Sequence, residues 1–365
     1  MPESLDLPLG TGDAASFDLM DVAQLEAMLP AAGGKLTGTR VEPVGTGQMA
    51  RSVRLHLTYA NVGSPGPATL VAKLPSDDPR SRRFGSGGNG FYAREVNFYK
   101  ELAAGSGARI PHCYHAAMDP VTGEFTILLE DLAPATQGDQ LAGLTVADTE
   151  LALVEAAKLH ASHWDDVSLD KRAWLVGADA APPWWAAAPK MAAMWEAFLA
   201  RYGAQVSSTV RMAGDRLMQG YDRFLRYRSE RRCLVHSDFR PDNLMFGVTA
   251  GSRAVWLIDW QTVGVGCGAA DVAFLLGGAL APEVRRAEER RLLAGYLSAL
   301  REAGVQDYGV AELEHDYARN TFRLFLAAVI GALSVQQTAR GDTMFFRMID
   351  GAADQIAATG ALDLL

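Results

Sequence analysis

The segment 234-LVHSDFRPDNLMFG-247 sets a cluster of polar residues between two apolar runs. The cluster includes His236, Asp238, Asp242 and Asn243. Polar turns usually lie on the surface and have no need of apolar flanks. The apolar flanks predict that packed residues fix the backbone of this loop, so that its carboxylate and amide groups emerge at defined positions. Within the loop, we expect Asp242 to be a turn residue that faces solvent.

A second segment, 256-WLIDWQTVGVGCGAADVAFLL-276, places Asp259 at the end of an apolar strand. Asn243 and Asp259, presented from two strand ends, would form a set of oxygen ligands. Mg²⁺ is a hard cation that takes few protein ligands and keeps waters and substrate phosphates for the rest. The pattern therefore indicates a Mg²⁺ site at Asn243 and Asp259. It leaves Asp238 as the group that orients or deprotonates an attacking hydroxyl.

The composition is that of a globular chain with enough residues for two or three domains. It has 365 residues, of which 49% are hydrophobic and 21% charged, and its formal net charge is −9. An acidic chain repels phosphate backbones, which argues against a nucleic-acid partner. No apolar run reaches the roughly 20 residues of a membrane span, and the acidic N-terminal segment does not resemble a signal peptide.

The cysteines indicate the compartment. The chain has three widely spaced cysteines, and no two of them stand in CxxC spacing: Cys113, Cys233 and Cys267. We therefore expect reduced, buried thiols and a cytoplasmic protein without membrane association.

The first third of the chain predicts a small antiparallel sheet with one main helix. Alternation of apolar and polar residues over 53–59 indicates a half-buried strand, and a turn sequence then leads into a second strand. The expected elements are a short helix at 18–30, strands at 53–59, 69–74, 113–118 and 124–130, a basic glycine-rich loop at 80–90 and a helix at 91–103.

From about residue 133 the pattern becomes mostly helical. The expected helices are 145–164, two within 184–228, and 284–303, 311–338 and 343–359, with short strands at 244–248 and 254–259. His160, on the first of these helices, is expected to serve core packing or capping. A strand-rich part followed by a helix-rich part indicates an α+β fold.

The spacing of His236, Asp238 and Asn243 resembles the H-x-D-x-x-x-x-N catalytic loop of the aminoglycoside phosphotransferase and choline kinase superfamily, distant relatives of the protein kinases. The resemblance covers nearly the whole chain. It implies a bilobal protein-kinase-like fold, with a nucleotide-binding lobe over 1–132 and a larger, mostly helical catalytic lobe over 133–365. It also implies that Asp238 is the catalytic aspartate and that ATP and Mg²⁺ are required.

The resemblance also assigns supporting and metal-binding roles, both within the loop and beyond it. Asn243 and Asp259 match the family's Mg²⁺-binding residues. Asp271 matches the structural aspartate that braces the catalytic loop, and His236 an orienting residue.

The resemblance extends to the first lobe. Lys73 matches the strand lysine that holds the α- and β-phosphates, and Glu95 the helix glutamate that pairs with it. The phrase REVNFYKEL at 94–102 is most similar to the ecdysteroid-kinase-like and acyl-CoA-dehydrogenase-associated branches.

Two further segments of the first lobe match nucleotide-binding positions. The stretch 45-GTGQMARSV-53 stands where the phosphate loop belongs, with Gly47 and Ser52 as its expected contacts. The stretch 127-ILLEDL-132 matches the hinge, whose backbone at Glu130 and Leu132 would meet adenine.

The acceptor side is less well specified. Arg240 stands where many relatives have histidine, and Trp260 and Gln261 follow a metal ligand directly. We expect these three residues to be candidates for substrate contact. A group of Trp and Met side chains could line an acceptor pocket, although such residues at helical spacing are usually core: Trp184, Trp185, Met191, Met194 and Trp195.

The sequence therefore predicts an ATP-dependent kinase for a hydroxyl of a small molecule. One alternative is an inactive nucleotide-binding homologue. Another is a protein kinase, against which the missing H-R-D, D-F-G and A-P-E motifs count. The acceptor stays open among amino alcohols, sugars, aminoglycosides, steroids and other alcohols, and a partly apolar alcohol that is not an antibiotic is favoured.

Overall fold

The computed structural model describes residues 18–29, 33–45, 49–61, 63–86, 90–175, 187–334 and 337–365. The chain forms two compact units. Unit 1 contains Met1–Gly105, Ile110–Pro134 and Ile258–Val263, and unit 2 contains Ser106–Arg109, Ala135–Leu257 and Gly264–Leu365. Ile258–Val263, which the expected division after residue 132 places in the second part, thus groups with the first unit. The reason is packing: Trp260 stacks on Phe98, with ring centroids 3.9 Å apart.

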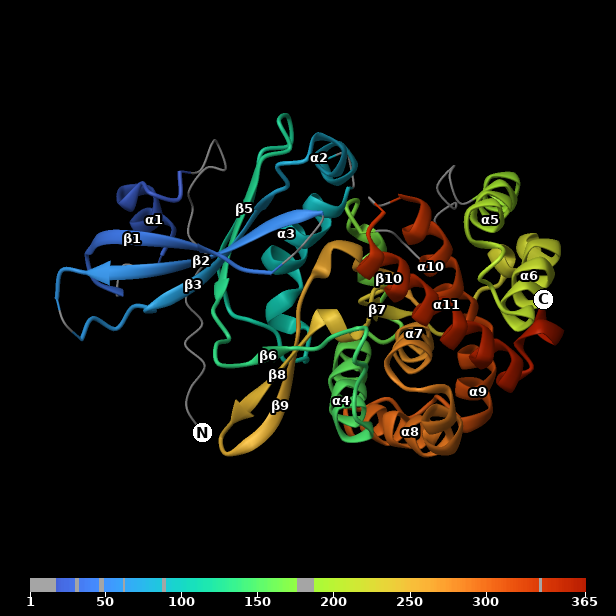
Figure 1. Ribbon diagram of the computed structural model, residues 1–365. Coiled ribbons are helices and arrows are strands. Elements are labelled where there is room, and N and C mark those ends of the chain that lie inside the picture. Colours follow the sequence, from blue (N-terminus) through green and yellow to red (C-terminus); the bar gives the residue numbers. More distant parts are fainter. Residues whose placement is uncertain are drawn as a thin grey trace. The chain divides into compact units, whose positions relative to one another are not determined.

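Unit 1 is built on a five-stranded antiparallel sheet with the order β1-β2-β3-β5-β4 (Figure 1). The strands are β1 (Leu36–Pro43), β2 (Ala50–Tyr59), β3 (Thr69–Pro75), β4 (Cys113–Met118) and β5 (Phe125–Glu130). Alternate residues of β2, including Val53 and Leu55, are buried with Leu25 of helix α1 (Val22–Met28). Lys73 points to the other face of the sheet, where it meets helix α3 (Phe91–Glu101).

The expected glycine-rich loop at 80–90 is wrong for its first part, which forms helix α2 (Pro79–Ser86). The carboxylate of Asp78 accepts the N–H of Ser81 at 2.8 Å, and proline is well suited to the first turn of a helix. Gly85 is required by packing, since a Cβ atom there would lie 2.4 Å from the ring of Tyr92. Residues 87–89 lie outside the described part of the chain.

Unit 2 is mostly helical, with short strands. Its helices are α4 (Val146–Ser162), α5 (Ala188–Tyr202), α6 (Ser208–Arg226), α7 (Ala269–Ala279), α8 (Pro282–Glu302), α9 (Val310–Asn320), α10 (Phe322–Ser334) and α11 (Ala339–Thr359). Strand β7 (Cys233–Val235) pairs with β10 (Gly264–Gly266), and β8 (Leu244–Thr249) lies between β6 (Thr136–Gln137) and β9 (Ser252–Leu257). An antiparallel sheet in one unit and helices in the other confirm the α+β class.

Two helices differ from the sequence-based expectation. The single helix expected at 311–338 is interrupted at Thr321, whose hydroxyl donates to the backbone oxygen of Ala318. Such side-chain bonds compete with the helical hydrogen-bond ladder. Helix α7 was not among the expected helices. Every residue of α7 is buried, so it has no polar face to produce a helical period.

The core of unit 2 contains aromatic and methionine side chains that had been considered for an acceptor pocket. Met191 and Trp195 are 1% and 4% exposed in this core, and the Trp195 indole donates to Asp215 at 2.8 Å. The structure therefore confirms the core interpretation for Met191 and Trp195 and leaves them out of an acceptor pocket. Trp184 and Trp185 lie outside the described residues. No helix in the described part of the chain is long and apolar enough to cross a membrane.

Candidate active site

The loop between β7 and β8 is fixed by one buried carboxylate. Asp271, in the first turn of α7, is 1% exposed and accepts the backbone N–H groups of His236 at 2.7 Å and Ser237 at 2.9 Å. Ser237 has a φ of 67°, a left-handed conformation that is unfavourable for a residue with a side chain. The two hydrogen bonds to Asp271 hold the backbone in this conformation.

Asp271 is itself held by a buried chain of polar groups. His160 of α4 is fully buried, and its Nε2 lies 3.2 Å from the Asp271 carboxylate. The other ring nitrogen of His160 lies 2.8 Å from the hydroxyl of Tyr296 in α8. Burial raises the pKa of Asp271, but the hydrogen bond and charge of His160, together with His236, bring this pKa below its ordinary value. The charged form of Asp271 is therefore favoured.

Asp238 and Asn243 meet within the loop. The Asn243 side-chain nitrogen donates to the Asp238 backbone oxygen at 2.8 Å and to its carboxylate at 2.9 Å. The Asp238 side chain stays 31% exposed. A carboxylate that is both fixed and accessible can orient a hydroxyl and accept its proton.

Arg240 joins the two carboxylates of the loop. Its Nε lies 3.2 Å from Asp238, and its Nη1 donates to Asp242. Burial lowers the pKa of Arg240, but the two carboxylates more than compensate and hold it above its ordinary value. Asp242 also accepts the backbone N–H of Gln140 at 2.8 Å. Asp242 therefore lies in a turn, as expected, but its side chain is only 24% exposed and is bonded to Arg240 and Gln140, which corrects the expectation that it simply faces solvent.

Asn243 is suited to a hard cation. Its nitrogen is committed to Asp238, so its side-chain oxygen is the atom left for a ligand. Amide and carboxylate oxygens are ligands that Mg²⁺ accepts. Among the described residues, no three His, Cys, Asp or Glu side chains gather as a metal-binding group.

Unit 1 contains a second charged constellation, centred on Lys73. The Lys73 ammonium lies 2.8 Å from Oε1 and 2.7 Å from Oε2 of Glu95, which confirms the expected ion pair. It also donates to Asp259 at 2.8 Å, a contact that the sequence did not predict. Burial lowers the pKa of Lys73, but Asp259 and Glu95 together hold it above its ordinary value. The ammonium is therefore charged at neutral pH.

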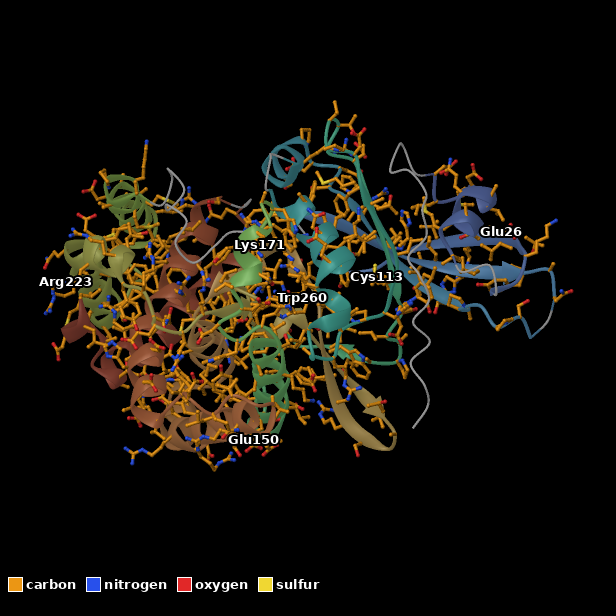
Figure 2. All side chains as sticks on the ribbon, turned by 180° about the vertical axis from the view of Figure 1, so that it is seen from behind. Glu26, Cys113, Glu150, Lys171, Arg223 and Trp260 are labelled. Atoms are coloured by element: carbon orange, nitrogen blue, oxygen red, sulfur yellow. The ribbon has the colours of Figure 1, made fainter. Side chains whose placement is uncertain are left out.

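The structure corrects the expected substrate contacts of Trp260 and Gln261. Trp260 is fully buried and lies beside α3 (Figure 2), where its ring stacks on Phe98. Its backbone N–H donates to Glu95 at 3.3 Å. Gln261 is 7% exposed. Both residues lie in the interior, so we do not retain them as acceptor contacts.

The expected nucleotide-binding residues that the structure describes, Ser52, Glu130 and Leu132, fall in unit 1. Ser52 lies on β2 and pairs in register with Lys73. Glu130 ends β5, with its N–H donated to the backbone oxygen of His112 at 2.8 Å, and Leu132 follows two residues later. Gly47 lies outside the described residues.

Sequence reasoning missed the residues that support the loop from other elements. Tyr296 and Gln140 belong to segments without any motif, and they reach the loop only through the tertiary fold. No spacing in the sequence indicates such contacts.

Comparison with known proteins gives a family. The sequence model described as the phosphotransferase enzyme family (APH) matches residues 58–313, which is more than half of the chain. No curated protein sequence matches the chain significantly.

Solved structures share the fold at low sequence identity. The Plasmodium vivax ethanolamine kinase is 11% identical with a TM-score of 0.53, over 86% of this chain and 82% of that one. A GDP complex of aminoglycoside 2′-phosphotransferase-IIIa is 12% identical with a TM-score of 0.53, over 86% and 92% of the two chains. Spectinomycin phosphotransferase, in complex with ADP and spectinomycin, is 12% identical with a TM-score of 0.50, over 94% and 98%.

The resemblance in fold agrees with the sequence match. The chain therefore belongs to the phosphotransferase enzyme family, and it is an enzyme that transfers phosphoryl groups.

Proposed function

We propose that the chain transfers the γ-phosphoryl group of ATP to a hydroxyl of a small molecule. The observation that carries this proposal is the loop of unit 2, in which Asp238 is fixed by Asn243 and Arg240 yet stays 31% exposed. In this reaction the acceptor oxygen forms a bond to the γ-phosphorus as the β–γ bridge breaks. ADP leaves, and Asp238 aligns the hydroxyl and takes its proton. Positioning and electrostatics then supply most of the catalysis.

The nucleotide phosphates are assigned to Lys73. The buried Glu95 carboxylate holds the Lys73 ammonium in place, which leaves its charge available for the α- and β-phosphates. Gly47 and Ser52 are assigned to the phosphate loop, and the backbone of Glu130 and Leu132 to adenine. Nucleoside diphosphates in two proteins of similar fold support a nucleotide substrate.

Asn243 and Asp259 are assigned as the protein ligands of Mg²⁺. Bound Mg²⁺ would neutralise charge on the phosphates of ATP. The contact between Lys73 and Asp259 implies that this carboxylate changes partners when a cation binds.

The acceptor is proposed to be an alcohol without several positive charges. A polycation such as an aminoglycoside is best bound by unpaired carboxylates. In the described part of the loop, Asp238 and Asp242 are both paired with Arg240. Proteins of similar fold act on both kinds of acceptor, as the names ethanolamine kinase and spectinomycin phosphotransferase indicate.

The test is a screen of ATP consumption by the purified protein over alcohols, sugars, amino alcohols and aminoglycosides. We expect ADP release that depends on one class of acceptor, with the phosphate recovered on its hydroxyl. ATP binding without consumption across the screen would favour the inactive homologue. Transfer of labelled γ-phosphate to proteins would favour a protein kinase.

A further inference from the structure

Unit 1 contains a partly buried ion pair that the proposed function does not use. Arg54 of β2 meets Asp131, the residue after β5, through two parallel contacts: Nε to Oδ2 at 2.6 Å and Nη2 to Oδ1 at 3.2 Å. The Asp131 side chain is 3% exposed and that of Arg54 is 25% exposed. A two-pronged pair of this kind fixes orientation as well as distance.

The carboxylate of Asp131 also sets the direction of its own backbone. Its Oδ1 accepts the N–H of Ala133 at 3.2 Å, which closes a turn directly after the sheet. Burial raises the pKa of Asp131, but hydrogen bonds from Arg54, Thr69 and Ala133 together bring it below its ordinary value. The charged carboxylate thus ties β2, the start of β3 and the turn after β5 to one point.

Asp131 lies in the sequence between Glu130 and Leu132, the two residues whose backbone is assigned to adenine. The ladder between β3 and β5 includes no pair beyond Leu70 and Glu130, so Asp131 and Leu132 leave the sheet without a partner strand. Among the described residues, the N–H of Leu132 has no hydrogen-bond partner. The side chain of Asp131 is therefore the main restraint on the backbone that presents this N–H.

We propose that Arg54 and Asp131 are positioning residues that hold the Glu130–Leu132 backbone in register with the adenine base. The inference rests on the proposed function, because it assumes that this backbone binds the base. Neither side chain touches ATP in this scheme. Their contribution comes from keeping one N–H and one carbonyl at a fixed angle, on which hydrogen bonds to a base edge depend strongly.

The experiment separates recognition of the base from recognition of the phosphates. Asp131→Asn, Arg54→Gln and the double variant are compared with the wild-type protein in calorimetric titrations with ATP, adenosine and inorganic tripolyphosphate. We expect Asp131→Asn to weaken ATP and adenosine binding by about tenfold, equivalent to about 1.4 kcal/mol, and to leave tripolyphosphate binding unchanged. The double variant should lose no more than Asp131→Asn alone, because the two residues act as one unit.

Arg40→Gln is the matched control. Arg40 of β1 forms an ion pair with Glu42 at 3.5 Å in the same sheet, but both side chains are exposed, at 64% and 43%. Glu42 also lies 3.6 Å from Arg54, so the control perturbs the charges around Arg54 while leaving its contacts with Asp131 in place. Exposed pairs contribute little, so this variant should bind all three ligands as the wild-type protein does. Arg54→Lys, which keeps the charge but lacks the two-pronged geometry, provides a test if Asp131→Asn does not fold.

The outcomes are distinct. If Asp131→Asn weakens ATP and tripolyphosphate binding equally, the pair only stabilises the unit and the inference is overturned. If Asp131→Asn leaves adenosine binding unchanged, the inference is overturned as well. A wild-type protein that binds tripolyphosphate but not adenosine would contradict the assignment of the base to Glu130 and Leu132. A wild-type protein that binds none of the three ligands would instead refute the proposed function.

Discussion

Asn243 donates two hydrogen bonds to Asp238, one to its backbone oxygen at 2.8 Å and one to its carboxylate at 2.9 Å. The two residues therefore form one rigid group, in which the amide fixes the direction of the carboxylate. Because the amide nitrogen makes both bonds to Asp238, the amide oxygen is the atom left for the proposed cation. One short contact thus couples the proposed base to the proposed metal ligand.

Replacement of Asp238 tests the proposed base. Asp238→Asn keeps the shape of the side chain but removes its capacity to accept a proton. We expect the rate of transfer to the acceptor found in the screen to fall by about 10²–10⁴-fold, the range for loss of a general base. ATP affinity should stay close to that of the wild-type protein. Acceptor-dependent ADP release and calorimetry give the two quantities.

Asp242→Asn is the matched control. It removes a carboxylate from the same loop, but one to which we assign no part in the reaction. It should retain most of the activity. An equal loss of rate in both variants would mean that the loop charge, and not a base at Asp238, determines the rate.

Replacement of Asn243 tests the metal site. Asn243→Ala removes the amide oxygen, so the Mg²⁺ concentration that half-saturates ATP binding should rise by about tenfold. This rise corresponds to a loss of about 1.4 kcal/mol of Mg²⁺-binding free energy. ATP titrations at a series of Mg²⁺ concentrations measure this shift. In excess chelator, the variant and the wild-type protein should bind ATP equally. A difference that persists without Mg²⁺ would contradict the assignment of Asn243 as a metal ligand.

Replacement of Lys73 tests the buried ion pair. Lys73→Met leaves the Glu95 carboxylate, whose side chain is 1% exposed, without its ammonium partner. Breaking a buried pair from one side costs about 3–5 kcal/mol of unfolding free energy. Adding Glu95→Gln to Lys73→Met should restore part of that loss, since the buried Glu95 charge is then removed, and Asp259, the other partner of Lys73, is 37% exposed and can be solvated. Urea denaturation of the single and double variants measures both effects, and a double variant less stable than Lys73→Met would contradict the explanation.

Much of the fold could be predicted because the sequence carries its own periodicity. The alternation of buried residues in β2, such as Val53 and Leu55, marks a strand with one face in the core. Helix α7 could not be predicted in this way, because burial on every side removes the period. The break at Thr321 depends on local side-chain bonds that a hydrophobic pattern does not register.

The site was predictable where its residues are close in sequence and harder to predict where the fold brings them together. Asp238 and Asn243 lie in one loop, and their spacing gives their contact. Trp260 was expected to face a substrate because it follows Asp259, but its ring is placed by packing on Phe98, which sequence order does not reveal. Arg240 pairs with Asp242 and covers part of it, and this contact too is set by the fold of the loop rather than by sequence order.

The support that Asp271 gives to the backbone of His236 and Ser237 can be tested through the pH dependence of the protein's stability. The pKa of its carboxyl is lowered in the folded protein, whereas the unfolded chain has a value of about 3.9. The folded state therefore favours the charged form. Its stabilising contribution is fully present above about pH 4 and is lost as the pH falls through the folded-state pKa.

Asp271→Asn removes this titration. The variant should be less stable than the wild-type protein by roughly 1–3 kcal/mol at pH 7, because the charged acceptor of the His236 and Ser237 amides is gone. The groups that face Asp271 are His160 and His236, with Tyr296 behind His160. Urea denaturation between pH 7 and pH 3 should show a constant difference near neutrality that shrinks below about pH 4. A difference that stays the same to pH 3 would mean that the shape of the side chain, and not its charge, holds the loop.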